Sequence, residues 1–443
     1  MAATIRKPSR HIAFGYAAEA AAPLAAQPEW LARLRAEARA LIAEGLPSPR
    51  VEEWKYTNLR PLAERRFAAV GETPPEAGRA ALARAELGRS AHRLVFVNGR
   101  FDAALSEIGD LPPGVVIESL ADALARDAGA LEGAIGRSAA VRRHPLAAYN
   151  TAFFTDGALI RLADGVALDE PVHLVFVGAA GASPIAYHPR LAIQVGAGSR
   201  LSLIESHLGV AGAYWSNPVA EIEIGADALV RHRKLQDETH EADHLSLADV
   251  SVVRGGRYES VLLSLGAALA RNEIVVRLEG EHAEARLDGG YLIDGKQHCD
   301  NTTRVEHLVP RGATREVYKG VLDGEARGAF QGTLIVHEGA VKTDAHQLSR
   351  TLMLSKGAEA DAKPELEIYA DDVKCSHGAS AGALDPAQMF YLRSRGIGER
   401  AARAMLIEGF IAETIGAIED EAVHGYFAAR IARWLAAHAG DAP

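Results

Sequence analysis

The chain has 443 residues, enough for two or three ordinary domains, and its 48% hydrophobic and 24% charged residues exclude wholesale disorder. Its 48 basic and 58 acidic side chains give a net charge of −10, which argues against nucleic acid as the main partner, because phosphate binding requires a basic surface. Only two cysteines are present, Cys299 and Cys375, which excludes a disulfide framework and a self-contained four-thiolate zinc or iron–sulfur site.

Targeting and membrane-spanning segments are not expected. Basic residues occur early in the chain, but Glu19 interrupts the apolar stretch that a signal peptide requires. The chain also lacks a run of the roughly 18 apolar residues that a spanning helix needs. The sequence therefore predicts a soluble protein of the cytoplasm.

Residues 1–148 are predicted to form a mixed region in which helices predominate. Apolar residues recur at helical spacing between positions 31 and 42, which predicts an amphipathic helix there. Residues 93–101 alternate apolar side chains around Asn98 and Gly99, a dipeptide typical of a type I′ turn, and therefore predict a β-hairpin.

Residues 149–382 consist of short strands in close succession, for example at 172–177, 191–195 and 273–278. Most of these strands alternate apolar and polar residues, as half-buried strands do. Small-residue corners follow many of these strands. Five of the corners contain Gly196, Gly225, Gly280, Gly339 and Gly357, and the distances between successive glycines, 29, 55, 59 and 18 residues, are irregular. This order predicts a β-solenoid, in which each coil buries its inward side chains on the next. A β-sandwich is the competing interpretation, which the scarcity of Asn-Gly hairpins disfavours.

Residues 383–443 are predicted to form a small helical domain. Asp385 followed by Pro386 is a typical helix start, with a side-chain cap and proline at the first helical position. Three short amphipathic helices bury little surface by themselves. Two compatible interpretations remain open at this point: a cap on the solenoid, or a docking surface for another protein.

One segment matches a nucleotide-binding motif only in part. Residues 290–296 match the GxxxxGK pattern of a phosphate-binding loop, but Gln297 stands where serine or threonine should hold magnesium. The following residues, 298–309, have strand character, whereas the loop should open a helix. Nucleotide binding at this site is not expected.

The clearest chemical pattern is DDVKCSHGAS, residues 371–380. Cys375 and His377 are two positions apart, so on a strand both side chains project from one face. A thiolate and an imidazole on one face are the start of a soft-metal or iron–sulfur site. Two ligands are too few for a closed tetrahedral site, so the remainder would come from another chain. From the residues alone, a structural cysteine with a hydrogen-bonding histidine is the simpler interpretation.

The other histidines of the strand region show no metal-ligand spacing. Each is interpreted as a solvent-facing or hydrogen-bonded strand histidine, and this applies to His207, His232, His240, His244, His282, His298, His307, His337 and His346. Cys299 is interpreted as a small buried side chain. No GxSxG elbow and no convincing acid/base pair of carboxylates are present. The residues alone indicate a solenoid component of an assembly, with a carbohydrate-directed solenoid enzyme as the alternative.

Three motifs resemble the SufB/SufD family of the SUF iron–sulfur cluster assembly system. Residues 50–59, RVEEWKYTNL, look like the R-x-E-x-WKYT-x-L signature near the start of SufD-type subunits, and residues 93–101 are similar to the family hairpin. Residues 371–379, followed by MFYLRSRG at 389–396 and EGF at 408–410, are shared by both branches. The WKYT segment, the low cysteine count and the length favour a SufD-type over a SufB-type subunit.

The resemblance implies a right-handed parallel β-helix between an N-terminal helical region and a C-terminal helical domain. It also implies a non-catalytic scaffold subunit that contributes to iron acquisition and nascent cluster assembly in a complex. The isolated chain would hold no cofactor, and iron or an iron–sulfur cluster would bind transiently in the complex. Whether a flavin binds the complex is left open.

The resemblance further implies partners and site residues. A SufB-type subunit would pair with the β-helix edge, with His377 and Cys375 as candidate iron or cluster ligands at that interface. A SufC-type ABC ATPase would dock on the C-terminal helices, where the expected docking residues are Phe390, Tyr391, Leu392, Arg393, Arg395 and Phe410. A homodimer of the free chain through the same edge is a further hypothesis.

Overall fold

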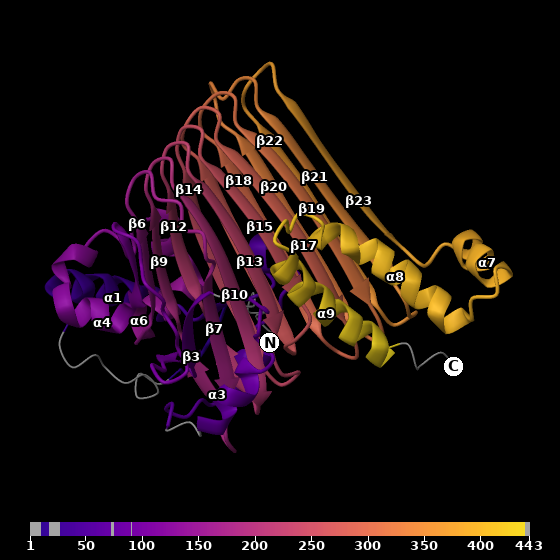
Figure 1. Ribbon diagram of the computed structural model, residues 1–443, viewed down its shortest axis with the longest axis horizontal. Coiled ribbons are helices and arrows are strands. Elements are labelled where there is room, and N and C mark those ends of the chain that lie inside the picture. The colour runs from indigo at the N-terminus through magenta and orange to yellow at the C-terminus, as the bar shows by residue number, and fades with distance from the viewer. Residues whose placement is uncertain (1–9, 17–26, 72–74, 90, 439–443) are drawn as a thin grey trace, which may run out of the picture.

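Two β-sheets stacked face to face form the body of the protein (Figure 1). The structure is a computed structural model that describes residues 10–16, 27–71, 75–89 and 91–438. The first sheet contains, in spatial order, β4 (Arg100–Phe101), β3 (His92–Val97), β7 (Val172–Ala179), β10 (Arg200–Ala211), β13 (Leu229–Asp237), β15 (Arg257–Ser264), β17 (Glu284–Ile293), β19 (Ala313–Leu322), β21 (Asp344–Met353) and β23 (Lys374–Gly382).

The second sheet runs alongside the first from one end of the molecule to the other. Its strands are, in spatial order, β5 (Val115–Ser119), β6 (Gly157–Leu162), β9 (Arg190–Val195), β12 (Val219–Ile224), β14 (Asp243–Val252), β16 (Leu269–Leu278), β18 (His298–His307), β20 (Arg327–Val336) and β22 (Glu359–Ile368). The short strands β8 (Ile185–Tyr187) and β11 (Tyr214–Ser216) pair beside it. From β12 onward the main strands alternate between the two sheets and pair in parallel, which confirms the solenoid and rules out the β-sandwich.

The coil repeat is more regular than the corner glycines suggest. Leu269 pairs with His298, and His298 pairs with Arg327, so one coil takes 29 residues here. The glycine steps of 55 and 59 residues each span two coils, and the step of 18 joins corners on opposite sides of the solenoid. The intervening corners also contain glycine, Gly255 and Gly256 after β14 and Gly312 after β18, so the corner glycines follow the coil repeat more closely than those five positions suggest.

Aliphatic ladders fill the space between the sheets. Val250, Val276, Val305 and Leu334 occupy matching positions in successive coils of the second sheet, and all are fully buried. Burying each such side chain contributes about 1.5–3 kcal/mol. A chain with only 6% aromatic residues can thus build a continuous core by stacking one coil on the next.

Some strand glycines make room for tyrosine rings. Tyr291 lies beside Gly320 of the next coil, and Tyr318 lies beside Gly289 of the preceding one. A Cβ atom at either glycine would lie 2.2 Å from the tyrosine ring. Part of the glycine content therefore serves ring packing across coils rather than turns.

The N-terminal part of the chain covers the first coils and contributes β3, β4 and β5 to the sheets. Val97 and Arg100 pair across an antiparallel turn in which Asn98 and Gly99 both have positive φ angles, so the type I′ hairpin is confirmed. β1 (His11–Ile12) pairs with β2 (Leu46–Pro47). The helical segments are α1 (Glu29–Ile42), η2 (Glu52–Trp54), α2 (Arg60–Glu64), α3 (Pro75–Leu82), α4 (Leu120–Asp127), η3 (Gly129–Leu131), α5 (Ala139–Arg143) and α6 (Pro145–Phe153).

The C-terminal helices are α7 (Pro386–Ser394), α8 (Glu399–Ile415) and α9 (Glu421–His438). The predicted start is confirmed, because the Asp385 side chain accepts a hydrogen bond from the Ala387 N–H at 2.8 Å. α8 and α9 lie across the outer face of the first sheet, while α7 projects past its last strand (Figure 1). The helices therefore cover one side of the solenoid and leave its last coil open, so the cap interpretation is wrong about their position.

The described residues show neither a phosphate-binding loop at 290–296 nor a helix that could span a membrane. The segment resembling a phosphate-binding loop forms the end of β17, a turn at Gly295 and the start of β18, so no helix begins there. Within the described part of the chain, no helix is long and apolar enough to cross a membrane.

Candidate functional site

The predicted ligand pair lies on β23, the last strand of the first sheet. In the parallel pairing with β21, Cys375 lies beside Ala345 and His377 lies beside Gln347. Ala345 and Gln347 are buried, whereas His346 between them is exposed. Cys375 and His377 therefore share the inward side of the sheet, at a coil over which no described strand continues.

The two side chains differ in accessibility. His377 is exposed, and Cys375 is half-buried against the aliphatic core. Burial, with the carboxylate of Asp344, raises the pKa of the Cys375 thiol, so the sulfur is protonated at neutral pH in the free chain. Because the thiolate is the effective metal ligand, His377 is the more available of the two.

Polar side chains continue from His377 into the solenoid. Gln347 and Glu316 occupy the same inward position in the two preceding coils, and both are buried. Gln347 Nε2 donates to Glu316 Oε2 at 2.7 Å, and Thr303 Oγ1 donates to the same oxygen at 3.1 Å. Burial raises the pKa of Glu316 to about 7. No local sequence pattern predicts this line of polar side chains, since only the coil repeat brings positions 316, 347 and 377 together.

Cys375 and His377 do not complete a metal site by themselves. Among the described residues, the one group of three ligating side chains that lie close together is at His207, Glu238 and His244. Two protein ligands leave a tetrahedral ion incomplete. A metal ion at β23 would need further ligands from outside the described chain.

The last coil presents unpaired strand edges. β22 and β23 end their sheets, and such edges readily pair with another strand. Pro364 removes one backbone donor from β22, whereas residues 378–382 of β23 are small and contain no proline. Ile368 and Tyr369, where β22 ends, are 42% and 63% exposed. This end face, formed by β22, β23 and residues 368–369, is partly apolar and open.

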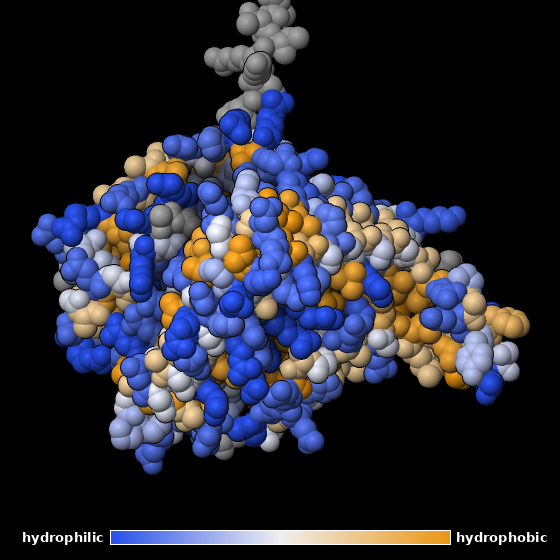
Figure 2. All heavy atoms as spheres, turned by 90° about the horizontal axis from the view of Figure 1, so that it is seen from above, coloured by the Kyte–Doolittle hydropathy of each residue, from blue (hydrophilic) through white to orange (hydrophobic). Residues whose placement is uncertain are grey.

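The expected docking residues divide into two groups. Phe390 and Tyr391 on α7 are 74% and 56% exposed, and Arg393 and Arg395 are exposed beside them. The Arg395 guanidinium lies 4.8 Å from the centre of the Tyr391 ring. Hydrophobic side chains gather on the projecting end of the molecule where α7 lies (Figure 2). This group forms an accessible aromatic and basic surface.

Leu392 and Phe410 are less accessible than the docking prediction requires. Both are half-buried, and Phe410 packs with the cluster that joins the helices to the first sheet. Lys319 Nζ donates to the Phe410 carbonyl at 3.0 Å and lies 4.8 Å from the ring centre. In the described chain, Phe410 helps to fasten α8 to β19.

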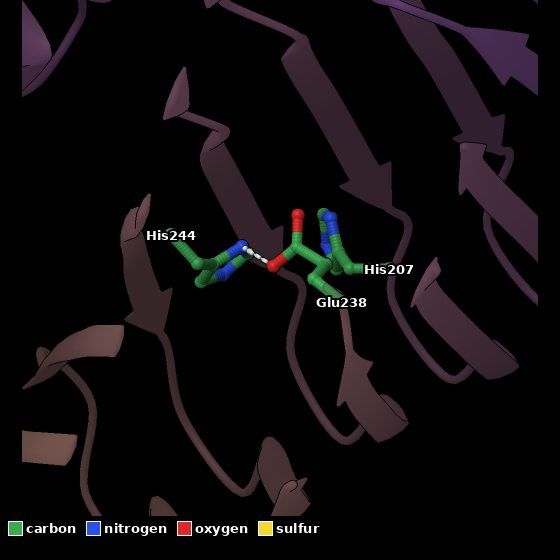
Figure 3. Close-up of side chains that lie close together, drawn as sticks. All are labelled: His207, Glu238 and His244. Carbon is green, nitrogen blue, oxygen red and sulfur yellow. Dashed lines mark ion pairs between the residues drawn. The ribbon is translucent and has the colours of Figure 1, made fainter. Parts of the chain in front are cut away.

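A second cluster lies inside the solenoid, where His207, Glu238 and His244 point toward one another (Figure 3). From their spacing, both histidines were expected to be separate solvent-facing or hydrogen-bonded strand residues. They meet because positions 207 and 238 are about one coil apart and His244 follows the next corner. The chain order contains no local motif for this cluster.

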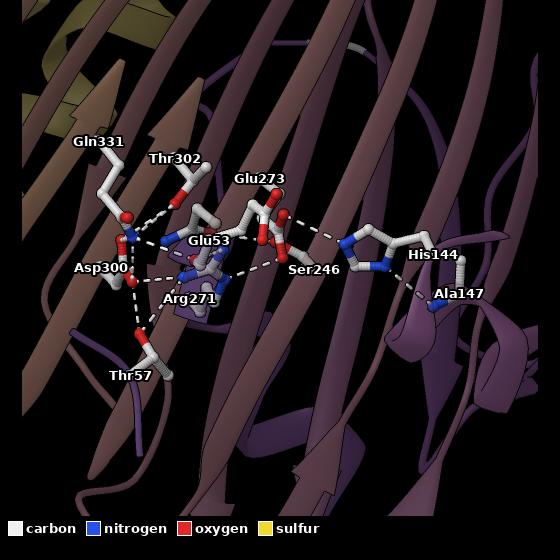
Figure 4. Close-up of polar contacts among 11 residues, drawn as sticks. Glu53, Thr57, His144, Ala147, Ser246, Arg271, Glu273, Asp300, Thr302 and Gln331 are labelled. Atoms are coloured by element: carbon white, nitrogen blue, oxygen red, sulfur yellow. Dashed lines mark hydrogen bonds and ion pairs between the residues drawn. The ribbon is translucent and has the colours of Figure 1, made fainter. Parts of the chain in front are cut away.

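The WKYT segment fastens the N-terminal region to the solenoid (Figure 4). The Trp54 ring lies 4.0 Å from the Arg271 guanidinium, and Arg271 Nη1 is 2.5 Å from Asp300. Thr57 donates its hydroxyl to the same carboxylate of Asp300. All four side chains are buried, so Trp54 and Thr57 have a structural role that explains their place in the motif.

The same network reaches a buried carboxylate, Glu273. Arg271 Nε donates to it at 2.8 Å, and His144 Nε2 lies 3.1 Å from its other oxygen. Burial alone would raise the pKa of Glu273, but the Arg271 and His144 side chains hold it well below its usual range. Glu273 is therefore an ionised structural anchor rather than an acid or base for catalysis.

The sequence matches two family descriptions that together span most of the chain. Residues 16–174 match the SufBD protein N-terminal region, and residues 176–410 match the SufBD core domain of SUF-system FeS cluster assembly. A SufBD family iron–sulfur cluster assembly protein of Synechocystis is 32% identical over 86% of this chain and 85% of its own length.

Two relatives are named iron–sulfur cluster assembly protein SufD. The Escherichia coli protein is 33% identical over 89% of this chain and 90% of its own length. The Bacillus subtilis protein is 26% identical over 90% of this chain and 92% of its own length.

The fold defines a class of protein, a two-sheeted parallel β-solenoid with helices along one side and an open last coil. The chain belongs to the SufBD family of the SUF iron–sulfur cluster assembly system. The resemblance drawn from its three motifs is thereby confirmed, on the SufD side of the family.

Proposed function

We propose that this protein is a non-catalytic scaffold subunit of a cytoplasmic SUF assembly complex. The observation that carries the proposal is the last coil, which places His377 and Cys375 on an open end face beside unpaired strand edges. A subunit that binds a cluster transiently needs ligands at a surface that a partner can reach and leave. The carbohydrate-enzyme alternative loses its support, since the family is one of iron–sulfur cluster assembly.

The partner at the end face would be a SufB-type subunit. β23 offers the better edge, because its small residues permit close approach and it lacks the proline that interrupts β22. Exposed Ile368 and Tyr369 add apolar contact area to the same interface. In this arrangement His377 supplies an imidazole to iron or a nascent cluster, and the partner supplies the missing ligands.

The partner on the helical side would be a SufC-type ATPase. α7 projects from the solenoid with Phe390 and Tyr391 largely exposed and with arginines beside them. Aromatic and arginine side chains are enriched at the energetic centres of protein interfaces. A helix that moves with the ATPase could transmit its motion along α8 to β19, on which α8 packs.

The test is co-expression with SufB-type and SufC-type homologues from the same genome, comparing wild type, His377→Ala and the control His346→Ala. His346 lies on the neighbouring strand but points to the outer face. We expect all three variants to form the complex, while His377→Ala alone loses most of its iron and sulfide, measured on the purified complex.

Two results would contradict the proposal in different ways. If His377→Ala loads iron and sulfide as wild type does, the ligand role of His377 is wrong and the cluster is held by the partner. If no complex forms with wild type, the pairing proposal itself is wrong, whatever the free chain does as a homodimer.

A further inference from the structure

The interior cluster lies where the first sheet turns into the second, far along the solenoid from β23. His207 lies near the end of β10, Glu238 follows β13, and His244 lies at the start of β14 (Figure 3). His207 and His244 have no exposed surface, and Glu238 is 4% exposed. The exposed residues His240 and Glu241 lie between Glu238 and His244 in the chain, so the cluster lies one short turn below the surface.

Several polar atoms of this cluster have no hydrogen-bond partner. These are Nδ1 of His207, Oε1 of Glu238 and both ring nitrogens of His244. Nδ1 of His244 is 2.8 Å from Oε2 of Glu238, but the contact lies off the direction of a hydrogen bond. Leaving one buried polar atom unpaired costs about 1–3 kcal/mol. Each of the three neighbouring side chains has at least one such atom, which indicates that the cluster binds a ligand.

The donor set matches a divalent transition metal ion. The ligand atoms of the three residues all lie within 4.8 Å of one another. Two imidazoles and one carboxylate bind zinc in hydrolases and iron(II) in oxygenases. With bonds of about 2.0–2.2 Å, ligand atoms around one ion are roughly 3–4 Å apart, so small side-chain rotations would close this set.

Residues around the cluster hold the ligands in the required form. Glu205 accepts a hydrogen bond from His207 Nε2 at 2.5 Å, which directs the free lone pair to Nδ1. The other oxygen of Glu205 lies 3.0 Å from His232 Nε2, and Gln236 Nε2 donates to Glu238 at 3.0 Å. Metal ligands in proteins are oriented by such second partners.

The charge of the cluster is compatible with a cation. Two buried carboxylates, Glu205 and Glu238, face one ammonium, that of Lys234, whose Nζ lies 4.0 Å from Glu205. This leaves an excess of one negative charge when both acids are ionised.

We propose that His207, Glu238 and His244 form a buried structural site for one divalent transition metal ion of the zinc or iron(II) type. His207 would bind through Nδ1, Glu238 through its carboxylate and His244 through one ring nitrogen. The ion would link three segments: β10, the corner that follows β13, and β14. This site is separate from the end-face ligands and needs no partner subunit.

The test uses the purified full-length chain without partners, stripped of metal and then loaded with Co²⁺, Zn²⁺ or anaerobic Fe²⁺. Metal per chain is measured by mass spectrometry, and Co²⁺ also reports tetrahedral nitrogen and oxygen ligands by its visible absorption. We expect one ion per chain in wild type and in His377→Ala, and at least tenfold weaker binding in Glu238→Gln and His244→Gln. His307→Gln controls for the loss of a buried histidine elsewhere in the solenoid.

Two further measurements use only the wild-type chain, so they stand even if a variant fails to fold. Metal should raise the melting temperature of wild type, and X-ray absorption of the zinc-loaded chain should show nitrogen and oxygen ligands without sulfur. Absence of a bound ion, a sulfur ligand pointing to Cys375, or loss of the ion in His377→Ala with retention in His244→Gln would each overturn the proposal. None of these results bears on pairing with a SufB-type subunit.

Discussion

The solvent exposure of a histidine in this chain depends on the coil in which it lies. His377 is exposed because no described coil covers its inward face, whereas His207, also on a strand of the first sheet, is buried among neighbouring coils. Position along the solenoid, rather than residue type, decides which imidazole meets solvent and which meets other side chains.

Glu316 shows the same dependence and gives a testable pH effect. Burial raises its pKa from 4.5 to about 7, so the folded state binds this proton more tightly than the unfolded chain. Its contribution to the free energy of unfolding is therefore most favourable below the unfolded pKa and falls as the pH rises toward 7, by up to about 3 kcal/mol. We expect urea unfolding between pH 5 and pH 8 to show this decrease in wild type.

The variant Glu316→Gln should reduce the decrease without abolishing it. Asp243, whose pKa burial also raises to about 7, contributes to the residual slope, as do Asp156, Glu238 and Asp288, whose pKa values burial raises too. An unchanged slope in Glu316→Gln would show that this carboxyl does not titrate in the folded state as its burial requires.

At the scale of elements, two segments with conspicuous composition do different work. In the WKYT segment Trp54 and Thr57 are buried, where Trp54 stacks on Arg271 and Thr57 binds Asp300. α7 carries Phe390 and Tyr391 outward. The WKYT segment therefore stabilises the fold, whereas the aromatic side chains of α7 are largely exposed and contribute little to its packing.

The double variant Phe390→Ala with Tyr391→Ala tests the role of α7. Because both rings are largely exposed, we expect the melting temperature of the free chain to change little. If α7 docks the ATPase, co-purification of a SufC-type partner should fall at least tenfold, while the SufB-type partner is retained. Met405→Ala, an exposed apolar residue on α8, is the matched control. Equal recovery of the ATPase with both variants would contradict docking at α7.

The whole molecule is a stack with two unlike ends. Helices of the N-terminal region lie beside the first coils, whereas the last coil is left open with β22 and β23 at its edges. α8 and α9 cover one side and do not protect that end. Natural proteins rarely leave such strand edges free, because a free edge can pair with a strand of another chain and cause aggregation. The architecture therefore predicts an interface at the end face.

The double variant Ala379→Lys with Ala381→Lys tests this prediction. Both residues are exposed on the inward side of β23, the side shared by Cys375 and His377. Two lysines there should block a partner coil without unfolding the free chain. We expect light scattering to show loss of the heterodimer, and of any homodimer, with a far-ultraviolet circular dichroism spectrum like that of wild type. A complex of unchanged mass would exclude the end face as the interface.

Much of the architecture follows from local patterns in the sequence. Alternating apolar residues and small corners predict the solenoid, Asn98-Gly99 predicts the hairpin, and Asp385-Pro386 predicts the start of α7. These succeed because strand alternation, turn conformation and helix capping depend on residues close together in the chain. The same-face placement of Cys375 and His377 is predicted for that reason too.

The tertiary structure decided what depends on the coil repeat and on packing. The alignment of Glu316, Gln347 and His377, and the meeting of His207, Glu238 and His244, require coils of a definite length, which the spacing of Gly196, Gly225, Gly280, Gly339 and Gly357 does not reveal. The position of α8 and α9 on the side of the solenoid depends on which sheet face offers apolar area. Contacts across a whole coil join residues about 30 positions apart, and no local propensity reports such a separation.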